Sequence, residues 1–445
     1  MLMSLSLFAA AAAAPAISRR LLGDFASPPA IIVSVWGATL GLFVLRLLPY
    51  APLDSTAWLV ILGTVAGLVA GSVAAIRSGR VFGEARPGSL PHPGAWVTVF
   101  GVIGLSGTLW YAASVIAVLG WDGFANAETL RYALFTQRIP SVFLFAQLFS
   151  VLTPILALAL VLGGTRLPRA VVALAIGCAL TTLTTTDRTQ FFSILLTSVF
   201  MTSHRFGRTL SWRRAGLIAM VSALLFVSSF LAIETWRLAS DRGLFLRLPG
   251  MVWVPGKGAV GPAETGPLAV LGRSGQRLAL MYAYATGSYA ALDRLLDVPA
   301  EPAGGVHTFF PVLRLLQRAG VLTIDLPPAI PDYVELYPQP APGLIALSFN
   351  SYTFIYYPLM DFGVVGALAY ALVVGLIAGL VYAWARRDRA DPLRLLVYGQ
   401  VATALTLTVI VNKFNNTAWW YVLVLGTAPW ALSALRRAVG PAGAR

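Results

Sequence analysis

Charged residues are scarce in this chain. Asp, Glu, Lys and Arg make up only 11% of its 445 residues, whereas 58% are hydrophobic. Soluble domains carry about 25% charged residues, so the deficit excludes an ordinary soluble fold. Apolar runs of roughly 17–25 residues recur along the sequence, which is long enough to cross a bilayer as helices. The composition therefore predicts an all-α polytopic membrane protein.

Cysteine and histidine are nearly absent. A single cysteine, Cys178, excludes an intramolecular disulfide framework and a cysteine metal site. The three histidines, His92, His204 and His307, show no His-x-x-x-His spacing, which disfavours a histidine metal site. We therefore predict no metal and no cofactor. The net charge of +14 by itself identifies no partner, and we expect no nucleic acid to bind.

Apolar runs predict about eleven transmembrane helices. Residues 2–17 form the first span rather than a signal peptide, because no positive charge precedes them while Arg19 and Arg20 follow. With the N-terminus outside, the internal segments hold 18 basic residues and the short external segments four, which is the asymmetry that orients membrane proteins. The predicted spans are residues 2–17, 30–50, 57–76, 95–120, 141–163, 170–186, 190–204, 215–236, 362–384, 395–412 and 418–435.

One large polar segment then lies outside, at residues 237–345, and carries nine Lys and Arg. Orientation does not require these cations, so we expect an anionic partner. The segment is predicted to hold one or two helices at 272–296 and a short amphipathic helix at 308–319. The predicted domains are residues 1–236 with eight spans; 237–361 with the external segment, its short helices and a re-entrant stretch; and 362–445 with three spans and a cytoplasmic tail.

Two candidate sites lie at outer ends of predicted spans. Arg188, in the turn between spans six and seven, can bind phosphate; the alternative is a local pair with Asp187. Glu234 lies in an apolar helix, where a carboxylate is costly unless it is paired. Arg237 follows it at i+3, so Glu234 is a candidate base and Arg237 a candidate anion ligand, with a surface salt bridge as the alternative.

The large external segment and the start of span nine supply further candidates. Asp361 is a candidate catalytic acid or base that needs an arginine partner if buried; the alternative is a helix N-cap. His307 is a candidate base near neutral pH, or simply a surface residue. Arginines beside tyrosines suit a phosphate and a sugar face, whereas the alternative is an amphipathic helix on lipid headgroups. These candidate ligands are Arg273, Arg277, Tyr282, Asn350 and Tyr352.

Ordered motifs over residues 170–385 resemble the Wzy-type O-antigen or oligosaccharide repeat-unit polymerases. They are Arg-Thr-x-x-Phe at Arg188, Asn-x-Tyr-Thr at Asn350 and Asp-Phe-Gly-x-x-Gly at Asp361, with the large external segment between the first two. The resemblance implies a GT-C-like fold in the bacterial inner membrane, with the active site facing the periplasm. It implies an undecaprenyl-pyrophosphate-linked oligosaccharide as substrate, arginines that bind its pyrophosphate, and a chain-length regulator and a flippase as partners.

Other functions stay open. An O-antigen ligase shares the donor but uses a different acceptor, and a histidine in the large external segment, such as His307, suits it. A lipid-linked oligosaccharide flippase predicts charges along midplane helices and pseudo-symmetric halves. A non-enzymatic assembly protein predicts no lipid pyrophosphate at Arg188 or Arg237. Finally, Gly375 and Gly379 form a GxxxG pattern, which predicts close packing between helices.

Overall fold

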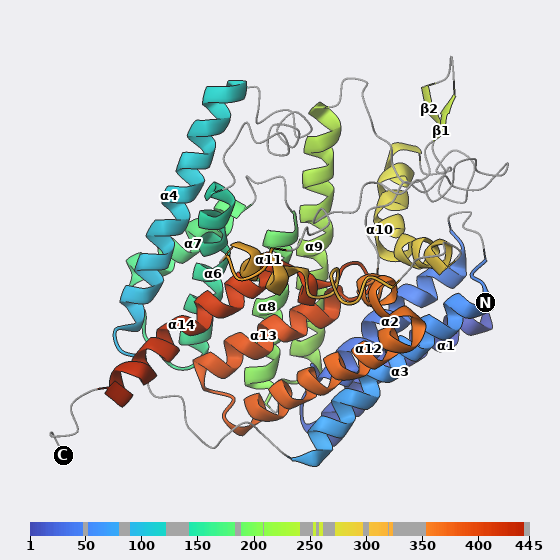
Figure 1. The fold of residues 1–445 in the computed structure, drawn as a ribbon, viewed down its shortest axis with the longest axis horizontal. Helices are drawn as coiled ribbons and strands as arrows, with labels where there is room; N and C mark the ends of the chain where they lie inside the picture. The colour runs from blue at the N-terminus through green and yellow to red at the C-terminus, as the bar shows by residue number, and fades with distance from the viewer. Residues whose placement is uncertain are drawn as a thin grey trace. The chain divides into compact units, whose positions relative to one another are not determined.

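The computed structural model describes residues 1–47, 52–79, 90–121, 142–182, 188–207, 209–240, 252–254, 258–260, 272–296, 302–318, 320–323 and 353–439. Regular structure in these ranges is helical, apart from one antiparallel pair of short strands, β1 (Val252–Val254) and β2 (Gly258–Val260) (Figure 1). The chain divides into two compact units, each assembled from separate stretches of sequence. Unit 1 comprises Met1–Arg80, Gly243–Leu380 and Ala404–Thr417, and unit 2 comprises Val81–Arg242, Val381–Thr403 and Ala418–Arg445.

Unit 1 is built on four long apolar helices that run alongside one another (Figure 1). Two further helices lie outside these spans: α10 has the bounds predicted at 272–296, and the shorter α11 lies within the helix predicted at 308–319. Its helices are α1 (Leu2–Leu22), α2 (Pro28–Leu45), α3 (Ser55–Ser78), α10 (Gly272–Leu296), α11 (Phe310–Arg318) and the first part of α12 (Tyr356–Arg387).

Glycines bring α3 and α12 into backbone contact. A Cβ at Gly71 would collide with the carbonyl of Leu372, and a Cβ at Gly375 with the carbonyl of Leu68. The Ser72 hydroxyl donates a hydrogen bond of 3.1 Å to the Gly375 carbonyl across this contact. Small residues permit such close approach in membrane helices, so the packing predicted from the GxxxG pattern is confirmed.

Unit 2 packs its helices around one apolar core. The core includes Leu152 and Ile155 of α6 with Leu395 and Leu396 of α13, and all four side chains are completely buried. The helices of this unit are α4 (Pro93–Leu119), α6 (Val142–Leu162), α7 (Arg169–Thr181), α8 (Arg188–Phe206), α9 (Trp212–Ser240), the end of α12, the first part of α13 (Pro392–Leu407) and most of α14 (Thr417–Val439).

Seven helices among the described residues are long and apolar enough to cross a membrane: α1, α2, α3, α4, the first part of α9, α12 and α14. The count of eleven spans is therefore not confirmed. The described part of α7 has 13 residues, about 20 Å of helix, whereas a hydrocarbon core is about 30 Å thick. α13 has 16 residues, and α8 carries several Ser, Thr and basic residues. The apolar helices indicate a membrane-embedded protein.

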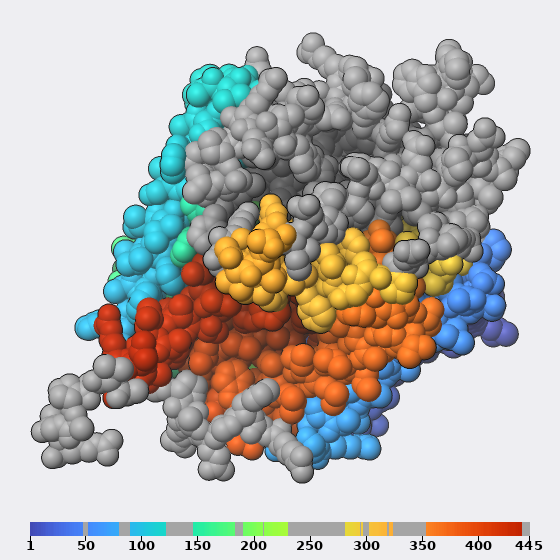
Figure 2. All heavy atoms as spheres, in the orientation of Figure 1, coloured from blue at the N-terminus to red at the C-terminus, as the bar shows by residue number. Residues whose placement is uncertain are grey.

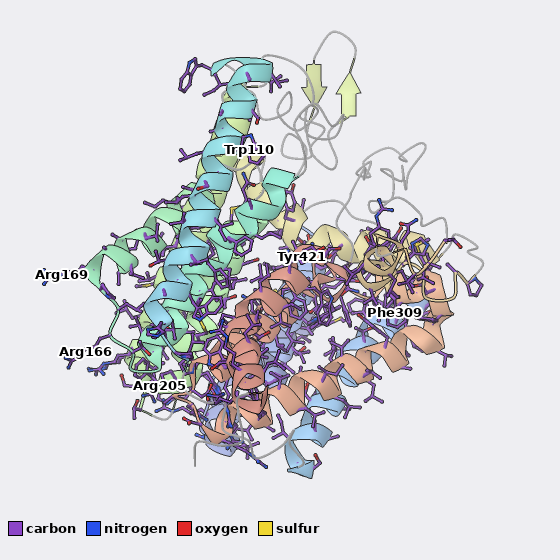
Figure 3. All side chains as sticks on the ribbon, turned by 60° about the vertical axis from the view of Figure 1, so that its left-hand side comes forward. Trp110, Arg166, Arg169, Arg205, Phe309 and Tyr421 are labelled. Atoms are coloured by element: carbon purple, nitrogen blue, oxygen red, sulfur yellow. The ribbon has the colours of Figure 1, made fainter. Side chains whose placement is uncertain are left out.

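Arginines close helix ends at one end of unit 2. The Arg205 Nε donates a hydrogen bond of 2.9 Å to the carbonyl of Leu162, the last residue of α6. The Arg389 Nη1 donates one of 3.1 Å to the carbonyl of His204, in the last turn of α8. Figure 3 shows Arg166, Arg169 and Arg205 at the same side. These segments thus lie at one end of unit 2, and the sequence predicts that they share one side of the membrane.

Candidate functional site

The most developed polar site in the described chain is a loop at residues 303–308 that is fixed to the start of α12. α12 is interrupted at Gly363, whose φ of 63° and ψ of −170° are not helical. An interruption leaves the preceding carbonyls without their normal helical donors. Two loop amides take those places: Ala303 N–H donates to Met360 O and Gly304 N–H to Asp361 O, each at 3.2 Å.

Asp361 completes this attachment with its side chain. The carboxylate is 1% exposed and accepts one hydrogen bond at each oxygen. His307 N–H donates to Oδ1 at 3.2 Å, and Thr308 N–H donates to Oδ2 at 2.5 Å. A buried Asp361 was expected to need an arginine partner. The partners of its two oxygens are instead backbone amides. Nor does the carboxylate act as an N-cap, because its partners lie in the loop.

His307 projects from this fixed loop. Its half-buried imidazole lies parallel to the ring of Tyr357, with ring centres 6.3 Å apart and 22° between the planes. Tyr357 is in the first turn of α12. The structure thus places two of the predicted catalytic residues together, with Asp361 holding the backbone that presents His307. In this geometry the Asp361 carboxylate contacts the loop backbone and the His307 ring faces Tyr357.

The loop depends on two glycines that sequence reasoning did not single out. Gly304 and Gly305 have φ values of 65° and 100°, in the region that disfavours side chains. A Cβ at Gly305 would also lie 3.1 Å from the ring of Phe309 and 3.2 Å from that of Phe362. The Gly-Gly pair beside His307 was the available signal for this turn.

Tyr282 is placed as a structural residue of α10. Its hydroxyl donates a hydrogen bond of 2.7 Å to Leu42 O and accepts one of 3.1 Å from Leu47 N–H, which closes the C-terminal end of α2. Burial raises the pKa of Tyr282, although the Leu47 amide opposes this shift. About two turns further along α10, the hydroxyl oxygen of Tyr289 lies 2.6 Å from Thr39 Oγ1. The ring of Tyr282, which was expected to face a sugar, is buried in these contacts.

The remaining candidates lie wholly or partly outside the described residues. Arg188 begins α8, Glu234 and Arg237 belong to α9, and Arg273 and Arg277 belong to the first turns of α10, but their side chains are outside the described part of the chain. Asn350 and Tyr352 lie outside it entirely. By sequence, Arg188, Glu234 and Arg237 belong to unit 2 and all other candidates to unit 1.

A metal site has no support among the described residues, where no group of three or more His, Cys, Asp or Glu comes together. The only cysteine, Cys178, is buried in α7. Among the described residues, the site thus consists of a histidine and hydrogen-bonding groups near the start of α12. The sequence matches no protein-family model, and no curated protein or solved structure matches it either.

Proposed function

We propose that this protein is a GT-C-like membrane glycosyltransferase that polymerises undecaprenyl-pyrophosphate-linked oligosaccharide repeat units. The observation that carries the proposal is the attachment of the His307 loop to the start of α12 through Asp361. A proton acceptor held rigidly where a membrane span begins suits a substrate with a lipid anchor and a polar sugar. The ordered motifs at Arg188, Asn350 and Asp361 supply the resemblance to repeat-unit polymerases.

In the proposed reaction, His307 accepts the proton of the acceptor hydroxyl as that oxygen attacks the anomeric carbon of the donor. The bond from this carbon to the lipid pyrophosphate breaks, and the pyrophosphate leaves with the electron pair. Arg188, Arg237 and Arg277 are the proposed ligands of that pyrophosphate, since guanidinium groups match its geometry and stabilise its developing charge. Asp361 keeps His307 in place through the loop backbone.

The test is incubation of the purified protein with a lipid-linked repeat unit. A polymerase gives a ladder of products, in which each step adds one repeat unit. Arg188→Ala and Arg237→Ala are expected to abolish the ladder at unchanged protein abundance, because the leaving pyrophosphate loses a cation. Arg166→Ala, at an exposed arginine of unit 2, is the matched control and should leave the ladder intact. Chains of normal length from both Arg188 and Arg237 variants would contradict the proposal.

A second candidate function is an O-antigen ligase, which His307 in the large external segment favours. A ligase would add one block to a different acceptor and give no ladder from the repeat unit alone. A flippase would move the lipid-linked unit across vesicles without forming a glycosidic bond. The same incubation therefore separates the three functions by product, and His307→Ala with His92→Ala as its control tests the base.

A further inference from the structure

The short helix α11 exposes an apolar face rather than burying it. Phe309, just before the helix, is 50% exposed, Val312 51% and Leu315 56%. Residues three apart lie on the same side of a helix, so these side chains form one strip. Arg314 and Gln317 lie on another side, where the Arg314 Nη1 donates a hydrogen bond of 2.6 Å to the Gln317 Oε1. α11 is thus amphipathic with its apolar side outward.

The strip continues onto the membrane span α12. The ring of Phe309 meets that of Phe362 edge-on, with ring centres 6.3 Å apart at 62°. Phe362 is itself partly exposed, and Val365, one turn further along α12, is 83% exposed. Because α12 is long and apolar enough to cross a membrane, exposed apolar side chains at this point are expected to face lipid.

The height of α11 relative to that span is fixed by the loop. The hydrogen bonds from residues 303, 304, 307 and 308 to Met360 and Asp361 hold the chain just before α11 at the start of α12. Figure 2 shows the side chains of α10 and of residues 302–318 at the surface. Figure 3 places Phe309 at this end of α12.

We propose that α11 is an interfacial helix whose apolar strip, Phe309, Val312 and Leu315, inserts into the phospholipid monolayer at the membrane surface. Apolar side chains would reach the acyl boundary while Arg314 meets lipid phosphates, as in other helices that lie in the plane of a membrane. Continuity with the lipid-facing side of α12 favours the bilayer over a protein partner. The loop before α11 would thereby keep His307 at the membrane surface. This inference does not depend on the proposed reaction.

Spin labels can test this in the whole protein reconstituted in phospholipid nanodiscs. Val312→Cys and Leu315→Cys probe the strip, and Arg314→Cys is the control on the polar side of the same helix; native Cys178 is buried. Oxygen partitions into lipid and a nickel chelate into water. We expect the labels at 312 and 315 to collide more with oxygen and the label at 314 more with the chelate.

A second readout uses the same three variants with a fluorescent label and brominated phospholipids. Quenching at 312 and 315 is expected to exceed that at 314 by about twofold or more. Three outcomes would overturn the proposal. In the first, the labels at 312 and 315 collide more with the chelate than with oxygen. In the second, protein shields them from both reagents. In the third, collision with oxygen and quenching by lipid rise only when a polyprenyl phosphate is added. The last outcome would assign the strip to a carrier lipid instead.

Discussion

Asp361 is held by backbone amides, which changes what its substitution should do. A buried carboxylate is costly without partners, and the amides of His307 and Thr308 supply them at its two oxygens. The same residue also accepts a bond from Gly304 N–H at its backbone carbonyl. One acidic residue therefore holds three positions of the loop, and under the proposed function it would act by positioning His307.

Removing the Asp361 carboxylate should loosen this loop. Asp361→Ala leaves two amides unpaired, at about 1–3 kcal/mol for each buried group, so amide hydrogen exchange at residues 307 and 308 should accelerate by about tenfold or more. Asp361→Asn keeps one acceptor oxygen, so its exchange rates at these amides should lie between those of the wild type and of Asp361→Ala. Hydrogen exchange by mass spectrometry measures both. Unchanged protection in the alanine variant would show that the two bonds do not hold the loop.

Measurements of kcat against pH can tell whether Asp361 positions His307 or itself transfers the proton. If Asp361 acts through His307, Asp361→Asn should lower kcat but leave the pH–rate profile with the same limb that wild type shows. His307→Ala should remove that limb. The reverse pattern, with the limb lost in Asp361→Asn and kept in His307→Ala, would make Asp361 the base.

At the scale of elements, glycines and arginines set how helices meet and end. α3 and α12 approach until their backbones touch at Gly71 and Gly375. In unit 2, the guanidinium groups of Arg205 and Arg389 satisfy carbonyls in the last turns of α6 and α8, where cations also complement the helix dipole. Basic residues counted in the sequence for orientation thus also act as caps.

Enlarging a glycine in the α3–α12 contact should separate the two helices. Gly71→Ala or Gly375→Ala places a methyl group against a backbone carbonyl that cannot move aside alone, so we expect a loss of about 1–3 kcal/mol and a lower midpoint of thermal unfolding in detergent. Gly216→Ala is the control, since a Cβ there meets nothing within 4 Å. Equal midpoints for the three variants would mean that the contact is not tight.

Local patterns predicted the elements well, whereas the site depends on contacts that leave no local trace. Residues 272–296 were predicted as one or two helices and form a single helix, α10, with these bounds. The shorter apolar runs were read as spans, yet the described part of α7 is too short to cross unaided. The pairing of Asp361 with residues 307 and 308 uses backbone amides, which every residue but proline has. No side-chain pattern could therefore reveal it.

At the scale of the whole molecule, the apolar helices indicate a membrane protein, and the arginine asymmetry predicts its orientation. The exposed arginines of unit 2 and the His307 loop of unit 1 are assigned to opposite sides of the membrane by this rule. The two assignments are linked, because the same alternation of predicted spans places both segments.

Labelling intact cells with a membrane-impermeant maleimide tests this orientation. A cysteine at exposed Pro302 should react from outside, whereas one at exposed Arg166 should react only after the membrane is opened. The protein with only its buried native Cys178 should remain unlabelled in intact cells. Reversed reactivity of the two sites would invert the topology and place the His307 loop in the cytoplasm.

The division of α12 and α13 between the two units has a consequence for biosynthesis. Unit 1 begins at Met1 but also requires Ala404–Thr417, so its first helices leave the ribosome long before their last packing partners are made. Gly71 of α3 cannot meet Leu372 until α12 has been inserted. The early helices are therefore made before the helix that packs against Gly71 exists.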